Sequence, residues 1–284
     1  MKQRSVVCWG EWIVYSTKFV LPVVFIVLGS LGACTSAPEK AVQVEQQLTP
    51  KQIELLLEAK RLNRQAAKLY QAGRTSEAIP LAKRVLAIEE SVLGPSHPQI
   101  ATSLNNLGYL LQDEGDLAGA KPYYEHALAI FEKVFGPDHP YTATSLNNLG
   151  YLLQDQGDLA EAKRHYERAL AIAENALGPE HPDTANKLNN LGNLLQTQGD
   201  LAGAKHYYER ALAIFEKVFG HEHRNTATSL NNLGALLQAQ GDLAAARRYY
   251  ARALAIAESV FGPEHPQTWT SLNNLGALLQ AQGD

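Results

Sequence analysis

Histidine is the residue type whose spacing in this sequence first points to chemistry, because its ring binds metals and exchanges protons near neutral pH. Five of the nine histidines recur at steps of 42 residues: His97, His139, His181, His223 and His265. A zinc site needs three or four ligands that meet at one point, whereas residues one repeat apart lie on successive units. We therefore expect no metal site, and we interpret these histidines as hydrogen-bonding residues at helix starts.

Other catalytic arrangements are not evident in the sequence. No serine or cysteine stands beside a distinctive histidine and acid, and the glycines do not form a phosphate-binding loop. The formal net charge of −4 at pH 7 offers no basic field for a nucleic-acid backbone. We predict a protein that is not an enzyme, needs no cofactor and has no small-molecule substrate or nucleic-acid partner.

The amino terminus has the features of a secretion signal. Lys2, Arg4 and Lys18 precede an uncharged apolar run from Phe19 to Ala33, which is shorter than the roughly 20 residues of a transmembrane helix. The run ends in Leu-Gly-Ala-Cys at residues 31–34, which resembles the lipobox of bacterial lipoproteins. This resemblance implies cleavage before Cys34 and a diacylglyceryl group on its sulfur.

The lipobox therefore predicts three segments. Residues 1–33 are a lipoprotein-type signal peptide, residues 34–50 are a flexible tether without apolar periodicity, and residues 51–284 form the body of the protein. The implied location is the bacterial cell envelope, with a palmitate-type lipid anchor in the outer membrane and the body facing the periplasm. The alternative is an uncleaved membrane anchor in which Cys34 has no special role.

A 42-residue repeat organises the body. The string LNNLG begins at Leu104, Leu146, Leu188, Leu230 and Leu272. We place the units near residues 51–98, 99–140, 141–182, 183–224 and 225–266, with a partial unit at 267–284. Repeats of this length are typical of stacked units that share one continuous core.

Each unit contains two helical patterns. Leu104, Leu107 and Leu111 form the apolar stripe of a first helix. Gly115 is suited to end that helix in a left-handed conformation, and Asp116 is suited to cap the second helix. Gly136 then ends the second helix, and a proline at position 140 begins the next. The unit is therefore predicted to be a helical hairpin.

These residues resemble the tetratricopeptide repeat. In the second unit Leu107 and Gly108 match the family's Leu-Gly pair, and Ala120, Tyr124 and Ala127 match its helix-packing positions. The 42-residue form is similar to the repeats of kinesin light chains. The resemblance implies an all-α fold, a right-handed superhelical solenoid of helical hairpins with about five and a half repeats. It also implies protein or peptide partners.

The family's first helices line a concave groove, so polar positions on those helices are candidate binding residues. We predict that the groove is formed by Asn105, Tyr109, Gln112, Asn147, Tyr151, Gln154, Asn189, Asn193, Gln196, Asn231, Gln238 and Asn273. Their carboxamides both donate and accept hydrogen bonds, which suits a peptide backbone. The alternative is that these side chains are solvated or bond neighbouring repeats to each other.

Two further features bear on the partner. The family's clamp for a terminal carboxylate has lysine at the position of Asn105, and no copy has it here, so an acidic peptide terminus is not the expected ligand. Tyr109 and Tyr151 are the groove's aromatic residues and lie at its amino-terminal end, and we expect peptide binding to be strongest near them.

The function that we expect is a non-enzymatic, lipid-anchored scaffold that binds peptide segments of partner proteins. One alternative is the amino-terminal region of a larger protein that continues into a caspase-like peptidase or a nucleotide-binding signalling module. Another is a purely structural, self-associating spacer.

Overall fold

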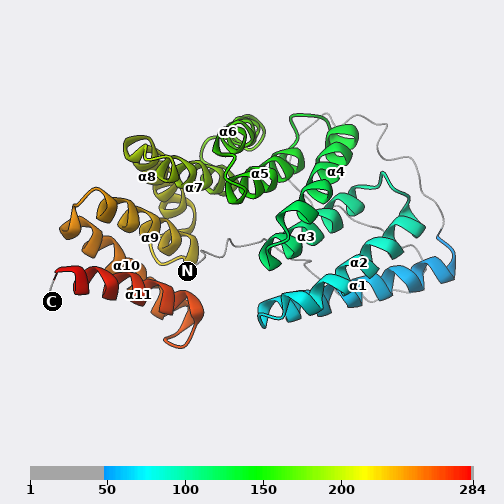
Figure 1. Cartoon of the computed structure of the whole chain (residues 1–284), viewed down its shortest axis with the longest axis horizontal. Coiled ribbons are helices and arrows are strands. Elements are labelled where there is room, and N and C mark those ends of the chain that lie inside the picture. Colours follow the sequence, from blue (N-terminus) through cyan, green and yellow to red (C-terminus); the bar gives the residue numbers. More distant parts are fainter. Residues whose placement is uncertain (1–47, 283–284) are drawn as a thin grey trace. The chain divides into compact units, whose positions relative to one another are not determined.

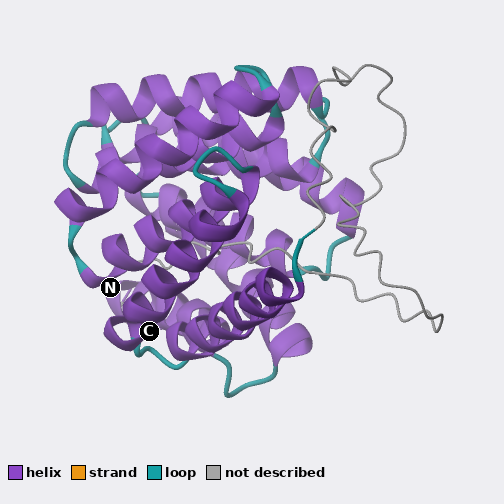
Figure 2. Ribbon diagram, turned by 90° about the vertical axis from the view of Figure 1, so that its right-hand side faces the viewer, coloured by secondary structure: helices purple, strands orange, loops and turns teal. Residues whose placement is uncertain are grey.

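The computed structural model describes residues 48–282, and residues 46–284 form one compact unit. The predicted signal peptide, Cys34 and most of the predicted tether lie outside the described residues. Within residues 48–282 all regular secondary structure is helical (Figure 2). The predicted all-α solenoid of helical hairpins is confirmed. None of the described helices is both long enough and apolar enough to span a membrane.

The first helices and second helices of the hairpins alternate along the chain. The first helices are α1 (Pro50–Gln71), α3 (Pro98–Glu114), α5 (Pro140–Asp155), α7 (Pro182–Thr197), α9 (Arg224–Ala239) and α11 (Pro266–Gln282). The second helices are α2 (Thr75–Leu93), α4 (Leu117–Phe135), α6 (Leu159–Ala176), α8 (Leu201–Phe219) and α10 (Leu243–Phe261).

The helix starts follow the predicted caps. Asp116 accepts a hydrogen bond from the backbone N–H of Gly119 at 2.8 Å and so caps α4. His97 accepts from the N–H of Gln99 through Nδ1 at 3.1 Å and so caps α3. The other four recurring histidines make the same bond at 3.1–3.2 Å. Their predicted role at helix starts is confirmed.

The helix ends also agree with the sequence. Gly115 has a φ of 94° and ends α3, and Gly136 has a φ of 97° and ends α4. Side chains other than glycine rarely adopt this left-handed region, so the two glycines fix where each helix stops.

A glycine and a tyrosine hold the two helices of a hairpin together. Tyr124 is 1% exposed and lies against Gly108 so closely that a Cβ added there would be 2.9 Å from the ring. Leu104 and Leu107 of α3 and Ala120 of α4 complete this core and are 0–2% exposed. The Leu-Gly and Ala-x-x-x-Tyr positions are therefore one packing unit.

Successive hairpins stack in sequence order (Figure 1). Each second helix packs against the first helices before and after it, and the first helices from α3 to α11 also contact the next first helix. Side chains one unit apart therefore meet, and the surface of the first helices is built from the same positions of every copy.

Candidate functional site

The predicted groove residues lie mostly between neighbouring units. Of the twelve, Asn273 is exposed, Asn105, Gln112 and Asn189 are buried, and the others are half-buried. Their hydrogen bonds explain this burial, and they fall into two sets. One set joins first helices of successive units, and the other joins the two helices of one hairpin.

The first asparagine of LNNLG bonds to the next unit. Asn105 donates through Nδ2 to the hydroxyl of Ser145 at 3.0 Å. Asn189 donates to Ser229 at 3.0 Å, and Asn231 donates to Ser271 at 2.9 Å. Each bond links two first helices, because donor and acceptor are 40 residues apart. These carboxamides therefore contribute to stacking of the solenoid.

The junction of α5 and α7 departs from this pattern. Lys187 stands where Ser145 and Ser229 stand in other copies, so no serine is available to Asn147. Asn147 instead accepts a hydrogen bond from Nδ2 of Asn190 at 2.8 Å. The array is therefore not uniform, and its middle junction uses the second asparagine of the string.

The recurring glutamine bonds to the core tyrosine. Tyr124 donates to Oε1 of Gln112 at 3.0 Å, and Nε2 of the same glutamine donates to Asp155 at 2.8 Å. The tyrosine bond recurs in three later units as Tyr166–Gln154, Tyr208–Gln196 and Tyr250–Gln238, at 3.1–3.3 Å. Burial raises the pKa of Tyr250 to about 12, so its hydroxyl stays a donor at neutral pH.

A different stripe of the first helices faces solvent. On α3 it consists of Thr102, Asn106, Tyr109 and Asp113, which are exposed or half-buried. We call this set and its equivalents the open stripe. The equivalents on the next two first helices are Thr144, Asn148, Tyr151 and Asp155, then Asn186, Asn190, Asn193 and Thr197. Within residues 48–282 no side-chain hydrogen bond engages Asn106 or Asn148.

Sequence reasoning placed Tyr109, Tyr151 and Asn193 on this surface but missed Asn106, Asn148 and Asn190. At about 100° per residue, Asn105 and Asn106 lie about equally far from the centre of the stripe formed by Leu104, Leu107 and Leu111, on its two opposite sides. The helix geometry of the sequence alone therefore does not separate the two asparagines; the side on which the next unit packs does.

Tyrosines cluster where the open stripe meets the first hairpin. The hydroxyls of Tyr70 and Tyr109 are 2.5 Å apart, and their rings meet edge to face at 5.4 Å. Burial and the hydrogen bond with Tyr70 raise the pKa of Tyr109 above its ordinary value. Thr75 donates to Asp113 at 2.7 Å beside them. Two tyrosine rings therefore contact each other at this end of the open stripe.

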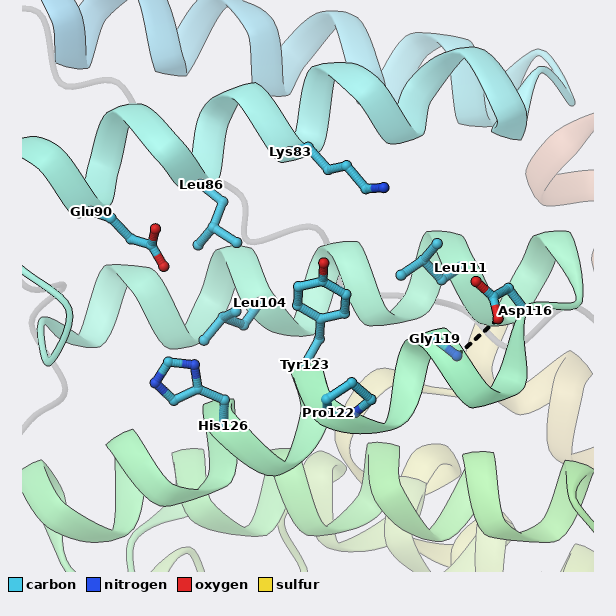
Figure 3. Close-up of a pocket in the computed structure, with 10 residues that line it drawn as sticks. All are labelled: Lys83, Leu86, Glu90, Leu104, Leu111, Asp116, Gly119, Pro122, Tyr123 and His126. Carbon is cyan, nitrogen blue, oxygen red and sulfur yellow. Dashed lines mark hydrogen bonds between the residues drawn. The ribbon is translucent and has the colours of Figure 1, made fainter.

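A cleft of about 530 Å³ opens on another side of the array, between α2, α3 and α4 (Figure 3). Leu86, Leu104 and Leu111 give it an apolar lining, and Lys83, Glu90 and His126 are among its polar lining residues. Tyr123 projects into the space between α2 and α4 (Figure 3).

The later junctions are bridged where this cleft opens. Arg168 pairs with Glu132 at 2.7 Å, Arg210 with Glu174 at 2.6 Å, and Arg252 with Glu216 at 2.6 Å. Each pair joins successive second helices, and we call them the arginine–glutamate ladder. The equivalent positions at the first junction are Glu90 and His126, and no ion pair joins these two in the described part of the chain.

Metal chemistry has no evident place in the described residues. No group of three or more histidine, cysteine or acidic side chains is arranged to hold an ion within residues 48–282. The recurring histidines use Nδ1 to cap helices, and His139, His223 and His265 also stack on Phe135, Phe219 and Phe261 at 4.3–4.6 Å.

Comparison with known proteins decides the family. The tetratricopeptide repeat profile matches residues 58–118, 99–175, 145–217, 183–259 and 225–284. The chain belongs to the tetratricopeptide repeat family. No curated protein matches the chain. Tetratricopeptide repeat proteins are generally non-enzymatic scaffolds for protein–protein interaction.

Solved structures support a kinesin-light-chain-like repeat. BtubC (BKLC) from P. vanneervenii is 26% identical, with 78% of this chain and 85% of that chain covered and a TM-score of 0.59. A putative kinesin light chain of Podosopora anserina, with nearly identical TPR-like repeats, is 27% identical over 71% of this chain and 96% of that one, with a TM-score of 0.57. The fold is also shared with pilF of Pseudomonas aeruginosa, at 21% identity over 82% and 92% and a TM-score of 0.51.

Proposed function

We propose that this tetratricopeptide repeat protein is a lipid-anchored scaffold of the bacterial envelope that binds peptide segments of partner proteins along the open stripe. The observation that carries the proposal is the row of hydrogen-bonding side chains there, which are uncharged except for Asp113 and Asp155. Within residues 48–282, Asn106 and Asn148 face outward without side-chain hydrogen-bond partners, whereas Asn105 uses its carboxamide inside the array. A carboxamide that both donates and accepts matches the backbone of a bound peptide.

The tyrosine cluster is the proposed centre of binding. Tyr109 and Tyr151 are half-buried, and the ring of Tyr109 contacts the ring of Tyr70 edge to face. Rigid aromatic side chains contribute large contact area at low entropic cost, so they are enriched among the residues that dominate binding. The stripe ends in Ala235 and Ala277 in the last two units, which offer less area.

Site-specific photo-crosslinking tests the binding surface. A photoreactive residue in place of Asn106 is compared with one in place of Glu125, an exposed residue of α4. We expect position 106 to label a defined peptide segment and position 125 not to label it. That segment should then bind at least tenfold more weakly to the double variant Tyr109→Ala, Tyr151→Ala. Equal labelling from both positions, or unchanged affinity of the double variant, contradicts the proposal.

The anchor needs a separate experiment. We propose that Cys34 is the first residue of the mature protein, that it carries the lipid, and that the repeats face the periplasm from the outer membrane. The apolar run and the Leu-Gly-Ala-Cys string support this. Mass analysis of the amino terminus should find a lipid-modified Cys34, and Cys34→Ala should release the protein from the membrane fraction. An uncleaved chain with unmodified Cys34 contradicts the proposal.

A further inference from the structure

The arginine–glutamate ladder is incomplete at the first junction. At the three later junctions the glutamate of one second helix meets an arginine of the next at 2.6–2.7 Å. At the first junction Glu90 keeps the glutamate position, but His126 holds the arginine position. Glu90 is exposed, and within residues 48–282 no side chain forms an ion pair or a hydrogen bond with its carboxylate. The acceptor of the contact is therefore present without its donor.

The cleft of about 530 Å³ lies where this contact is incomplete. Glu90 and His126 both line it, and Figure 3 shows them approaching from α2 and α4 at one end. Pro122 and His126 stand where the next junction has Arg164 and Arg168, so two of the side chains here are shorter. Small-ligand sites have volumes of roughly 300–1,000 Å³. The cleft therefore has room for a few residues of an extended peptide.

The ring of Tyr123 gives the cleft a flat aromatic surface. It is half-buried and projects between α2 and α4 (Figure 3). Leu86 and Leu104, which are 8% and 2% exposed, form an apolar floor. A guanidinium is planar and weakly hydrated, so it can stack on an aromatic ring while its N–H groups bond to a carboxylate. An ammonium lacks this planar, bidentate geometry. These lining residues therefore favour arginine over lysine as the missing donor.

Lys83 gives the cleft a charge opposite to that of Glu90. In the next three second helices the same position holds Glu125, Glu167 and Glu209. Lys83 is exposed and has no ion-pair partner among the described residues. It lies two helical turns before Glu90, which is about 10 Å along α2. In an extended peptide, residues two apart point to the same side and are about 7 Å apart. A cation and an anion at that spacing have side chains long enough to reach both residues.

We propose that the cleft between α2, α3 and α4 binds an extended segment of a partner protein that carries the pattern Arg-x-Glu. The guanidinium of the arginine pairs with Glu90 and stacks on Tyr123. The carboxylate of the segment's glutamate pairs with Lys83. The first of these contacts is one that the chain already makes three times between its own helices. This site is distinct from the open stripe and does not depend on the proposed function there.

Fluorescence anisotropy with a labelled peptide tests the proposal on the full chain in detergent. The probe is the pentapeptide Ala-Arg-Ala-Glu-Ala, with an uncharged fluorophore on its amino terminus and an amide at its carboxyl terminus. We expect saturable binding that weakens about tenfold for Glu90→Gln and for a peptide with lysine in place of arginine. Glu174→Gln, which removes the acceptor of an occupied ladder pair, is the matched control and should bind as the parent does.

His126→Arg tests whether the cleft is the place where the peptide binds. The new arginine should pair with Glu90 from within the chain and so abolish peptide binding. Its midpoint of thermal denaturation should equal or exceed that of the parent, which shows that the fold is retained.

A double-mutant cycle tests the second charge pair. Glutamine in place of the peptide's glutamate should weaken binding to the parent but not to the variant Lys83→Ala. An additive cycle overturns the Arg-x-Glu pattern, because the peptide's carboxylate would then not meet Lys83.

Three other results overturn the proposal as a whole. The first is the absence of saturable binding to the parent, and the second is undiminished binding to His126→Arg. The third is an equal loss for Glu90→Gln and Glu174→Gln, or equal binding of the arginine and lysine peptides, because either would indicate general electrostatic attraction.

Discussion

The first junction of the array, between α2, α3 and α4, differs from the later junctions in what its side chains do. At the later junctions Phe215 and Ala173 fill the core, and arginines bridge the second helices. A serine accepts a hydrogen bond from an asparagine at each later junction except the one that holds Lys187. At the first junction Glu89 takes the core position, Ser103 donates to that carboxylate at 2.5 Å, and the cleft lies where the bridge would be.

The residues that all copies share therefore determine the fold of the array. Residues that differ in a single copy change the packing and the polar contacts of one junction. Glu89 is 7% exposed, and burial raises the pKa of its carboxyl to about 7. A charge held at a core position costs stability that a phenylalanine or alanine does not cost. The first junction is therefore expected to be the weaker one, and its sensitivity to substitution can be compared with that of its copies.

A glutamate at the equivalent core position of a later junction should lower the free energy of unfolding more than the other substitutions. Phe215→Glu loses a side chain that is 1% exposed and buries a charge in its place. We expect it to lower the free energy of unfolding by about 3–5 kcal/mol, as measured by urea titration followed by circular dichroism. Val218→Glu, three residues along the same helix and 46% exposed, is the control and should change stability by less than about 0.5 kcal/mol. Similar losses for the two variants would contradict the assignment of this position to the core.

The pH dependence of stability should single out Glu89. Because its folded pKa of about 7 lies above the ordinary 4.5, the folded state holds the proton more tightly than the unfolded state. This contribution is fully present below pH 4.5 and is lost as the pH rises through 7. Between pH 5.5 and pH 8 we expect the parent to lose about 2 kcal/mol relative to Glu89→Gln in urea titrations.

The helix-capping histidines respond in the opposite direction. Burial lowers the pKa of His97, His139 and His223, so their contribution is present above pH 6.5 and is lost as the pH falls. Both proteins of the Glu89 comparison contain the same histidines, and their difference isolates the carboxyl. Parallel pH profiles for the parent and Glu89→Gln would show that Glu89 does not titrate as stated.

Two asparagines at equivalent positions of different units should differ in how much each contributes to the free energy of unfolding. Asn105→Ala removes the donor to Ser145 and should cost about 1–2 kcal/mol of unfolding free energy. Asn63→Ala, at the equivalent position of the first unit, should cost less than about 0.5 kcal/mol, because Ser103 there is engaged with Glu89. Both values come from urea titration, and an equal cost for the two variants would mean that Ser103 serves both residues.

The arginine–glutamate ladder should contribute least to the free energy of unfolding. Arg210→Ala removes a bridge whose two side chains are each about one-third exposed, and we expect a loss of less than about 1 kcal/mol that shrinks further in high salt. His126→Arg should add a bridge to Glu90 at the first junction, with a gain in the same range. Thermal denaturation at low and high salt measures both, and a salt-independent effect would argue against an ionic origin.

Most of the fold was predictable because each hairpin is specified by local signals. Gly115, Asp116 and Gly136 each have one conformational role, and each takes it in the structure. The packing of Gly108 on Tyr124 was likewise implied by the family resemblance and is confirmed by their close approach.

The surface of the first helices was harder to predict, because Asn105 and Asn106 are identical in type and adjacent in sequence. Their roles depend on which side of the helix the next unit covers, and the twelve predicted groove residues were chosen without that information. The cleft was not predicted from the sequence, and His126, which lines it, stands where later units have an arginine.

The bonds between units have a consequence for how the gene can change length. Partners such as Asn189 and Ser229 are 40 residues apart, and the ladder pairs are 36 residues apart, so each contact joins a unit only to the next one. If recombination removed or duplicated one whole 42-residue unit, the rejoined ends would still present matching residues. The exception is the junction that holds Lys187, where Asn190 of the same copy donates to Asn147 of the copy before it. Arrays of different length are thus accessible in one genetic step, and this junction would mark which unit was exchanged.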